Sequence, residues 1–297
     1  MHLPDSFIST IKNTFGADGE TFLTSLPSLV DESTRRWELT SIRPVSNLSY
    51  NFVAFAKRGE EEVVLKIGVP RDELMSEMAA LDLFNGDGAC RLLDCDPQKG
   101  LLLLERLNPG GMLSELQDDD KRTHIAADVM QKIWRDAPAD ATFIRLADWF
   151  HGLKRIRTRF EGRTGPFPKE ILERVESILP ELFEAPSLLL HGDFHHFNIL
   201  SSERGWQVID PKGVIGPAGY EIGPLMLNPW ISPLNTNQFK VQTERRVGIL
   251  SERLGWERGF ILNWATAHAV LSAWWDFEEN MDWQYPISCA QVFANLG

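Results

Sequence analysis

Three side chains that carry oxygen ligands lie close together in the sequence, at Asp193, Asn198 and Asp210. The transfer of a phosphoryl group needs such side chains, because catalysis of this step consists mainly of positioning and of neutralising charge. One carboxylate can accept the proton of the attacking hydroxyl group, while an amide and a second carboxylate can hold Mg²⁺ against the phosphates. We therefore expect Asp193 to be the catalytic base, and Asn198 and Asp210 to be ligands of the metal ion.

The spacing of these residues and the apolar runs around them favour the same chemistry. Asp193 precedes Asn198 by five positions, as the catalytic Asp precedes the metal-binding Asn in the protein-kinase pattern. Residues 188–190 and 199–200 flank the segment as short buried strands would, and residues 206–209 form an apolar run before the second carboxylate. A polar loop between two buried strands is a rigid platform for catalysis.

The histidines of this segment leave two other interpretations open. His and Asp side chains on one loop can ligate zinc, and four residues here have those types: His191, Asp193, His195 and His196. No second group of His or Cys with ligand spacing follows downstream, which weighs against a zinc site. His191 and His195, taken singly, could also serve only to satisfy backbone groups. His196 and Lys212 are further candidates for contact with the substrate or with the transferred group.

The elements that must position these residues begin with a small antiparallel sheet. The alternation of apolar and polar residues predicts strands at residues 39–42, 51–56 and 62–67, with residues 57–60 as the hairpin between the last two. Two short helices, divided around Leu26-Pro27, are expected before the sheet. A helix at residues 72–84 is expected after it, because apolar residues recur there at helical spacing.

Lys66 closes the third predicted strand, where a kinase places the lysine that contacts the α- and β-phosphates. A lysine at the end of a strand is usually a solvated edge residue, but its order before a helix and a catalytic loop favours the phosphate role. Glu77, in the middle of the following helix, is the expected partner of Lys66, and Glu73 one turn earlier is the alternative. An exposed helix charge remains the other interpretation of either glutamate.

Four further residues are expected to contact the nucleotide. Residues 101–104 form a buried apolar run that leads into a hinge, so Glu105 and Leu107 are expected to meet the adenine edge through main-chain groups. The loop after the first strand contains no glycine, so close approach of its backbone to phosphate is less freely available. We expect the side chains of Ser46 and Asn47 to supply these contacts instead.

Helical patterns dominate the rest of the chain. They cover residues 121–136, 144–160, 169–183, 243–254 and 260–279. Four carboxylates stand beside aromatic residues at the end of the last pattern: Asp276, Glu278, Glu279 and Asp282. Such a cluster could hold the guanidinium or ammonium group of a substrate, although a solvated helix end explains it equally well.

The composition restricts the classes of partner. With 42 acidic against 30 basic residues and a net charge of −12, the chain is not expected to bind a nucleic-acid backbone, and a cationic small molecule suits it better. Its 297 residues are enough for two lobes with their own cores. Three scattered cysteines indicate reduced thiols and a cytoplasmic location, and no apolar run approaches the length of a membrane span.

Residues 191–198 resemble the motif HGDxxxxN of the aminoglycoside phosphotransferases. The doubled histidine and the continuation IDPKG at residues 209–213 resemble more closely the aminoglycoside/hydroxyurea antibiotic resistance kinase family, which includes streptomycin 6-kinases. The likeness extends over nearly the whole chain, with similar segments at residues 86–93, 102–110 and 271–275.

This resemblance implies an α+β, protein-kinase-like bilobal fold, with an antiparallel sheet in the small lobe and a mainly helical large lobe. We expect the small lobe to span residues 1–106 and the large lobe residues 107–297. The resemblance also implies an ATP- and Mg²⁺-dependent O-phosphotransferase that acts on a hydroxyl group of a small molecule, with an aminoglycoside or aminocyclitol as the expected acceptor. A kinase of a cellular sugar or amino alcohol, and a nucleotide-binding pseudokinase, are the alternatives, and the retained Asp193 and Lys66 argue against the second.

Overall fold

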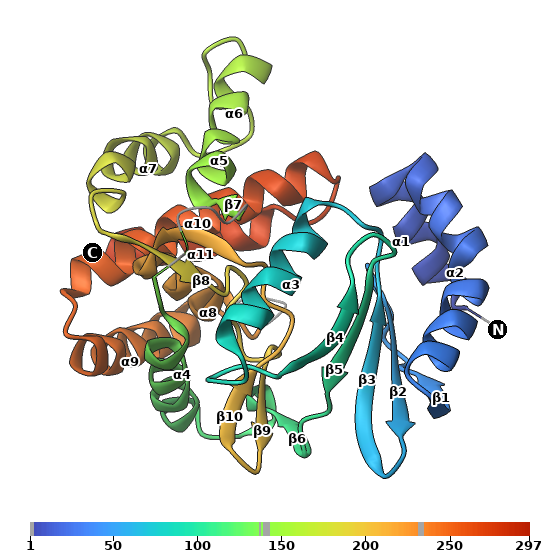
Figure 1. Ribbon diagram of the computed structural model, residues 1–297. Helices are drawn as coiled ribbons and strands as arrows, with labels where there is room; N and C mark the ends of the chain where they lie inside the picture. The colour runs from blue at the N-terminus through green and yellow to red at the C-terminus, as the bar shows by residue number, and fades with distance from the viewer. Residues whose placement is uncertain (1–2, 137, 139–142, 231–234) are drawn as a thin grey trace.

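The computed structural model describes residues 3–136, 138, 143–230 and 235–297 (Figure 1). A five-stranded antiparallel sheet has the strand order β1-β2-β3-β5-β4. The strands are β1 (Leu39–Pro44), β2 (Phe52–Arg58), β3 (Glu61–Ile67), β4 (Leu92–Asp96) and β5 (Leu101–Glu105). The three strands predicted before residue 68 and the run at 101–104 are confirmed. Strand β4, with the sequence LLDCD, was not predicted, because aspartate is depleted in strands.

One face of the sheet is covered by α1 (Asp5–Phe15) and α2 (Ala17–Arg36), which lie on the opposite side from α3 (Asp72–Phe84) in Figure 1. Side chains of α1 and α2 form a hydrophobic core with the sheet, and this core includes Phe7, Ile11, Phe22, Leu26, Phe52 and Leu65. The expected division around Leu26-Pro27 is wrong. The helices part at Gly16, which has φ +56°, and Pro27 lies inside α2. Burial of Leu26 in this core offsets the roughly 3 kcal/mol that an interior proline costs a helix.

The other face of the sheet shares its core with the helical lobe. Because side chains alternate along a strand, Leu102 and Leu104 face α3, and both belong to the same hydrophobic cluster as Leu81 and residues of the helical lobe. The connection after α3 is also bonded to that lobe: Cys90 donates its N–H to the carbonyl of Val208 at 2.8 Å. The sheet and the helical lobe are thus joined through α3 and the segment that follows it.

The helical lobe is built mainly from helices, as expected. They are α4 (Asp119–Ile133), α5 (Leu146–His151), α6 (Lys154–Arg159), α7 (Lys169–Leu182), α8 (Ile222–Leu227), α9 (Thr236–Leu254), α10 (Arg258–Glu278) and α11 (Gln284–Leu296). The single helix expected over residues 144–160 is wrong, because the first two of these residues form strand β7 (Ile144–Arg145) and the rest divide at Gly152 into α5 and α6. No helix of the described ranges is long and apolar enough to cross a membrane.

Two small sheets hold the loops of the predicted site. In one sheet, β11 (Val214–Pro217) pairs antiparallel with β8 (Ser187–Leu190) and parallel with β7. In the other, β9 (Ile199–Ser202) pairs with both β10 (Gly205–Val208) and β6 (Pro109–Met112). The strands predicted around the site are therefore confirmed. One loop lies between β8 and β9, and a second lies between β10 and β11.

Candidate active site

Main-chain hydrogen bonds join the two loops that carry the predicted catalytic residues. The N–H of Ile209 donates to the carbonyl of Asn198 at 2.9 Å, and the N–H of Lys212 donates to the carbonyl of His191 at 2.6 Å. The first bond fixes Asn198 directly beside the residue that precedes Asp210. The two predicted metal ligands, which lie on different loops, are thus brought together by backbone structure.

The main chain of Asp193 is held on both sides. Its N–H donates to Nδ1 of His191 at 3.1 Å, and its carbonyl accepts a hydrogen bond from the Asn198 side-chain amide at 3.0 Å. The other ring nitrogen of His191 lies 2.9 Å from the carbonyl of Ile209, which assigns the proton to Nε2. Both ring nitrogens of His191 are therefore engaged within the protein. Within the described residues, no group of three or more His, Cys, Asp or Glu side chains is arranged to hold a metal ion, so the zinc interpretation finds no support.

The carboxylate of Asp193 is ionised at neutral pH. Burial alone would raise its pKa, but the neighbouring imidazole of His195, the ammonium of Lys212 and the ring of His191 bring the pKa well below the usual range. Nε2 of His195 lies 3.5 Å from Oδ1 of Asp193. The sequence left His195 as a candidate zinc ligand or as a residue that satisfies backbone groups. The structure instead places its ring against the carboxylate of the predicted base.

Lys66 forms a buried ion pair with Glu77, as expected. Its Nζ lies 2.6 Å from each carboxylate oxygen of Glu77, and it also contacts Asp210. Burial lowers the pKa of Lys66, but the two carboxylates more than offset this and raise it, so the ammonium stays charged. Glu73, the alternative partner, is exposed in the first turn of α3. A single cation therefore links β3, α3 and the loop that carries Asp210.

The loop that carries Asp210 has an unusual backbone. Asp210 has φ +58°, in the left-handed region that few residues other than glycine, asparagine and aspartate adopt. Gly213 follows with φ +63°, and its carbonyl accepts a hydrogen bond from the Ser76 hydroxyl at 2.5 Å. The nearby ammonium of Lys66 lowers the pKa of Asp210 to about 2. Ser76 was not predicted to contribute, although its position beside Glu77 on the buried face of α3 was available in the sequence.

Glu221 is a second residue that the sequence did not single out. Its carboxylate is fully buried and accepts the N–H of His191 at 2.6 Å and the N–H of Gly192 at 3.3 Å. Burial raises its pKa to about 8, against the opposing effect of these two hydrogen bonds. The signal in the sequence was a lone carboxylate between Tyr220 and Ile222, because a charged residue among buried apolar ones requires a partner.

The donor set at Asn198 and Asp210 suits a hard cation. The amide nitrogen of Asn198 donates to the carbonyl of Asp193, which leaves Oδ1 as the atom able to ligate. The side chain of Asp210 is 44% exposed, and its low pKa keeps it ionised. Carboxylate and amide oxygens of this kind are the usual protein ligands of Mg²⁺. The residues present therefore fit the expected metal ion.

The main-chain N–H of Glu105 is engaged within the protein, because it donates to the carbonyl of Arg91 at 2.9 Å. The side chain of Glu105 is also engaged, by the N–H of Arg91 and by Arg204. The predicted main-chain contact of Glu105 with a nucleotide would therefore be made by its carbonyl group. Leu107 is buried, while Ser46 and Asn47 are exposed in the connection between β1 and β2.

The two predicted substrate contacts, His196 and Lys212, have different surroundings in the structure. His196 is fully buried, and burial brings its pKa well below the usual value, so the expected contact of its ring with a substrate is wrong for this structure. Lys212 lies among Asp210, Glu73 and Asp193, whose charges raise its pKa against the effect of burial. It therefore remains a candidate beside the transferred group.

The four carboxylates predicted at the end of α10 also differ in their surroundings. Glu278 forms an ion pair with Arg155 at 2.7 Å, so the expectation that it serves the substrate is corrected. Asp276 is mostly buried and Glu279 is exposed. Asp282 accepts the N–H of Gln284 at 3.2 Å. Only part of the predicted cluster is thus available to a ligand.

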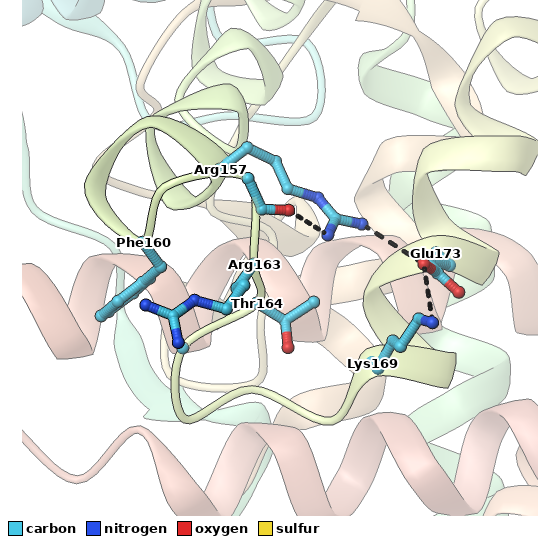
Figure 2. A pocket seen from close by; sticks show the side chains of 8 residues that line it. Arg157, Phe160, Arg163, Thr164, Lys169 and Glu173 are labelled. Carbon is cyan, nitrogen blue, oxygen red and sulfur yellow. Dashed lines mark hydrogen bonds and ion pairs between the residues drawn. The ribbon is translucent and has the colours of Figure 1, made fainter.

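A pocket of about 670 Å³ lies elsewhere, between α6 and α7 (Figure 2). None of the residues predicted to act in catalysis or binding lines it. Its lining carries three basic side chains, Arg157, Arg163 and Lys169, and the carboxylate of Glu173. Glu173 lies 3.8 Å from both Arg157 and Lys169. The lining of this pocket is therefore mainly basic, and it has no part in the predicted site.

Comparison with known proteins agrees with this geometry. The model of the aminoglycoside/hydroxyurea antibiotic resistance kinase family matches residues 36–280. A streptomycin 6-kinase of Streptomyces glaucescens is 29% identical over 283 residues, which cover 94% of this chain and 92% of the relative. A hydroxyurea phosphotransferase of Kitasatospora aureofaciens is 28% identical over 290 residues, which cover 94% of this chain and 81% of the relative.

Among solved structures, choline kinase LicA from Streptococcus pneumoniae is similar, with a TM-score of 0.60 and 15% identity over 92% of this chain and 98% of that one. This likeness shows that the fold is the protein-kinase-like fold that the sequence predicted. The chain is therefore a small-molecule kinase, and it belongs to the aminoglycoside/hydroxyurea antibiotic resistance kinase family.

Proposed function

We propose that the protein is an ATP- and Mg²⁺-dependent O-phosphotransferase that phosphorylates a hydroxyl group of an aminoglycoside or aminocyclitol such as streptomycin. The observation that carries this proposal is the joined arrangement of Asp193, Asn198, Asp210 and Lys66 on two loops and a strand. Each of these side chains has the charge and the chemistry that phosphoryl transfer requires at its position.

In the proposed reaction, Asp193 orients the acceptor hydroxyl and receives its proton while the oxygen bonds to the γ-phosphorus. The bond from that phosphorus to the bridging oxygen of ATP breaks, and the products are a phosphate ester and ADP. Lys66, held by Glu77, binds the α- and β-phosphates, and Asn198 and Asp210 hold Mg²⁺. When bound, Mg²⁺ neutralises phosphate charge. The proposed contacts with the nucleotide also include the side chains of Ser46 and Asn47, the carbonyl of Glu105 and the main chain of Leu107.

Two observations support a cationic acceptor. The chain carries a net charge of −12, and carboxylates lie at the end of α10. Two relatives named streptomycin 6-kinase are 29% and 27% identical to this chain. The proposal includes a cytoplasmic location, where ATP is available. It also includes a lobe boundary between residues 106 and 107, because β5 ends at Glu105 and β6 begins at Pro109.

An acceptor screen tests this function. ADP release is measured with streptomycin, other aminoglycosides, hydroxyurea, sugars and amino alcohols, with Asp193→Asn protein as the control for contaminating activity. The expected result is ADP release that depends on streptomycin or a related aminoglycoside, together with a phosphate ester detected by mass spectrometry. Turnover with sugars or amino alcohols alone would identify a kinase of a cellular metabolite. No turnover with any acceptor would favour a nucleotide-binding module.

A further inference from the structure

The guanidinium of Arg135, which follows α4 in the helical lobe, binds the C-terminal end of α3. Its Nη1 donates to the carbonyl of Leu83, in the last turn of that helix, at 2.9 Å. Its Nη2 donates to the carbonyl of Asp87, in the connection that follows, at 3.1 Å. The last carbonyl groups of a helix have no partner within the helix and carry partial negative charge. Arg135 therefore supplies hydrogen bonds and positive charge at the point where α3 ends.

The same guanidinium also binds the C-terminal end of α4. Its Nε donates to the carbonyl of Ile133 at 3.3 Å, and its Nη2 donates to the carbonyl of Lys132 at 3.4 Å. The guanidinium carbon lies 4.9 Å from the centroid of the Phe84 ring, and the side chain is partly buried. A guanidinium has five N–H donors in one plane, whereas an ammonium is a point charge. A lysine could therefore not join the two helix ends in this way.

The main chain of Arg135 is bonded to the strand that leads into the catalytic loop. Its carbonyl accepts the N–H of Leu189 at 2.8 Å, and Leu189 belongs to β8. Strand β8 ends at Leu190, three residues before Asp193. The end of α3, the end of α4 and the strand before the predicted base thus meet at one residue.

Helix α3 lies between the five-stranded sheet and the helical lobe, and it supplies two side chains to the candidate active site (Figure 1). Glu77 holds the ammonium of Lys66 at 2.6 Å, and the hydroxyl of Ser76 donates to the carbonyl of Gly213. Leu83 lies six residues after Glu77, which is about 9 Å along a helix. A shift of the C-terminal end of α3 would therefore displace Glu77 relative to Lys66.

The connection after α3 has its own bonds to the helical lobe. The N–H of Val208 donates to the carbonyl of Gly88 at 2.8 Å, and the N–H of Cys90 donates to the carbonyl of Val208. These bonds begin four residues beyond Phe84, where the helix ends. Arg135 reaches the last turn of the helix itself, so its side chain acts on the position of α3 more directly than these bonds do.

We propose that Arg135 is a positioning residue for phosphate binding. It holds the C-terminal end of α3 against the helical lobe, so that Glu77 keeps Lys66 where the α- and β-phosphates of ATP are bound. This inference deepens the proposed function and rests on it, because it assumes that Lys66 binds those phosphates. Since the bond to β8 uses the carbonyl of Arg135, a change of its side chain leaves the support of the Asp193 loop in place.

Calorimetry measures the binding of ATP with Mg²⁺ to the full chain, for the parent, Arg135→Lys and Arg135→Met. The lysine keeps the charge, and the methionine keeps an apolar stem over Phe84. We expect each variant to bind ATP roughly 2- to 30-fold more weakly, the range for residues that act on a site without contact to its ligand. Urea denaturation shows whether each variant is folded at the assay temperature. If Arg135→Met is not folded, Arg135→Lys decides the test.

Arg174 provides the matched control, because its guanidinium binds the end of a different helix. Its Nη1 donates to the carbonyl of Ala294 in the last turn of α11 at 2.7 Å, and its Nη2 donates to Oδ1 of Asn263 at 3.3 Å. Neither partner belongs to α3 or to the loops of the candidate site. Arg174→Lys should therefore change the affinity for ATP by less than about twofold, even where it lowers stability as much as Arg135→Lys does.

Two further measurements separate positioning from a general loosening of the structure. Adenosine has no phosphates, so Arg135→Lys should bind it with less than about a twofold loss. In protein that also carries Glu77→Gln, the path from Arg135 to Lys66 is already broken. The loss of ATP affinity in this double variant should therefore be smaller than the product of the two single losses.

ATP affinities equal to that of the parent in Arg135→Lys and Arg135→Met would overturn this role. Equal losses for adenosine and ATP, or losses that multiply in the double variant, would overturn it too. A parent protein that binds no ATP would contradict both this role and the proposed function. ATP binding that depends on Arg135 through Glu77, in a protein that phosphorylates no acceptor, would support the positioning role and contradict the proposed function.

Discussion

Asp193 is positioned through its main chain, whose N–H bonds to His191 and whose carbonyl bonds to the Asn198 amide. Its carboxylate takes no part in these two hydrogen bonds, and Nε2 of His195 lies 3.5 Å from its Oδ1. A substitution of the side chain therefore leaves the loop in place. Asn198, by contrast, uses its side chain for both the loop and the proposed metal site, so its substitution would confound the two roles.

Asp193→Asn should retain nucleotide binding and lose turnover, because the amide has nearly the same size but cannot accept the hydroxyl proton. General-base assistance is worth about 10²- to 10⁴-fold, so kcat with the best acceptor should fall within that range. Asp148→Asn, on the exposed surface of α5, is the matched control. A decrease in kcat of less than about tenfold for Asp193→Asn would contradict its role as the base.

Asp210→Ala should weaken the binding of ATP chiefly when Mg²⁺ is present, because it removes a hard oxygen ligand. Glu77→Gln is the informative comparison, since it removes a partner of Lys66 without removing a proposed metal ligand. ATP affinity is measured in a titration with Mg²⁺ for each protein. We expect Glu77→Gln to weaken ATP binding at every Mg²⁺ concentration. An unchanged metal dependence in Asp210→Ala would move the ligand role to another residue.

At the scale of elements, the sequence predicts what local periodicity determines. The strands around Lys66 and around Asp193 were predicted because their apolar runs are short and bounded by turns. The helices that surround Gly16 and Gly152 were misplaced because their ends depend on tertiary contacts, such as the pairing of β7 with β11. The surroundings of His196 and Glu278 could not be predicted from sequence for the same reason. Residues distant in the chain bury His196, and Arg155 forms an ion pair with Glu278.

The turn between β10 and β11 is the element that couples Asp210 to α3. A Cβ at Gly213 would lie 2.4 Å from the carbonyl oxygen of Ser76, whereas a Cβ at Gly205 would meet nothing within 4 Å. Both glycines have positive φ, at +63° and +89° respectively. An alanine at position 205 therefore has only the backbone penalty, whereas an alanine at position 213 also has a steric clash.

Gly205→Ala should lower the free energy of unfolding by about 1 kcal/mol, the usual cost of the left-handed conformation. Gly213→Ala should lower it by a further 1–3 kcal/mol or so, because the new methyl group must displace α3 or the turn. Urea denaturation measures both. Gly213→Ala should also weaken Mg²⁺-dependent binding of ATP, since Asp210 lies in the same turn. Equal losses of stability in the two variants would show that the contact with Ser76 yields without cost.

For the whole molecule, Glu221 makes stability depend on pH. Its pKa is raised from the usual 4.5 to about 8, so the folded chain holds this proton more tightly than the unfolded chain. The stability that Glu221 contributes is complete below its usual pKa and is lost as the pH rises through about 8. The pKa values of His191 and His268 are lowered to about 4 from 6.5, so their contribution is lost only as the pH falls below 6.5.

The free energy of unfolding of the parent should therefore fall by roughly 1 kcal/mol more than that of Glu221→Gln between about pH 7 and about pH 9. The glutamine cannot ionise, and its amide oxygen can still accept the N–H groups of His191 and Gly192. Urea denaturation across this range measures the difference. Parallel pH profiles for the two proteins would show that the carboxyl has the same charge in the folded and unfolded chains.

Helices α1 and α2 cover one face of the five-stranded sheet. The family match begins at residue 36, yet Phe7, Ile11, Phe22 and Leu26 complete the core against one face of the sheet. A protein trimmed to residues 36–280 would expose that apolar face to water and would also lose α11. Exposed apolar patches of this size promote self-association. The segment that the family model matches is thus smaller than the part of the chain that covers both faces of the sheet.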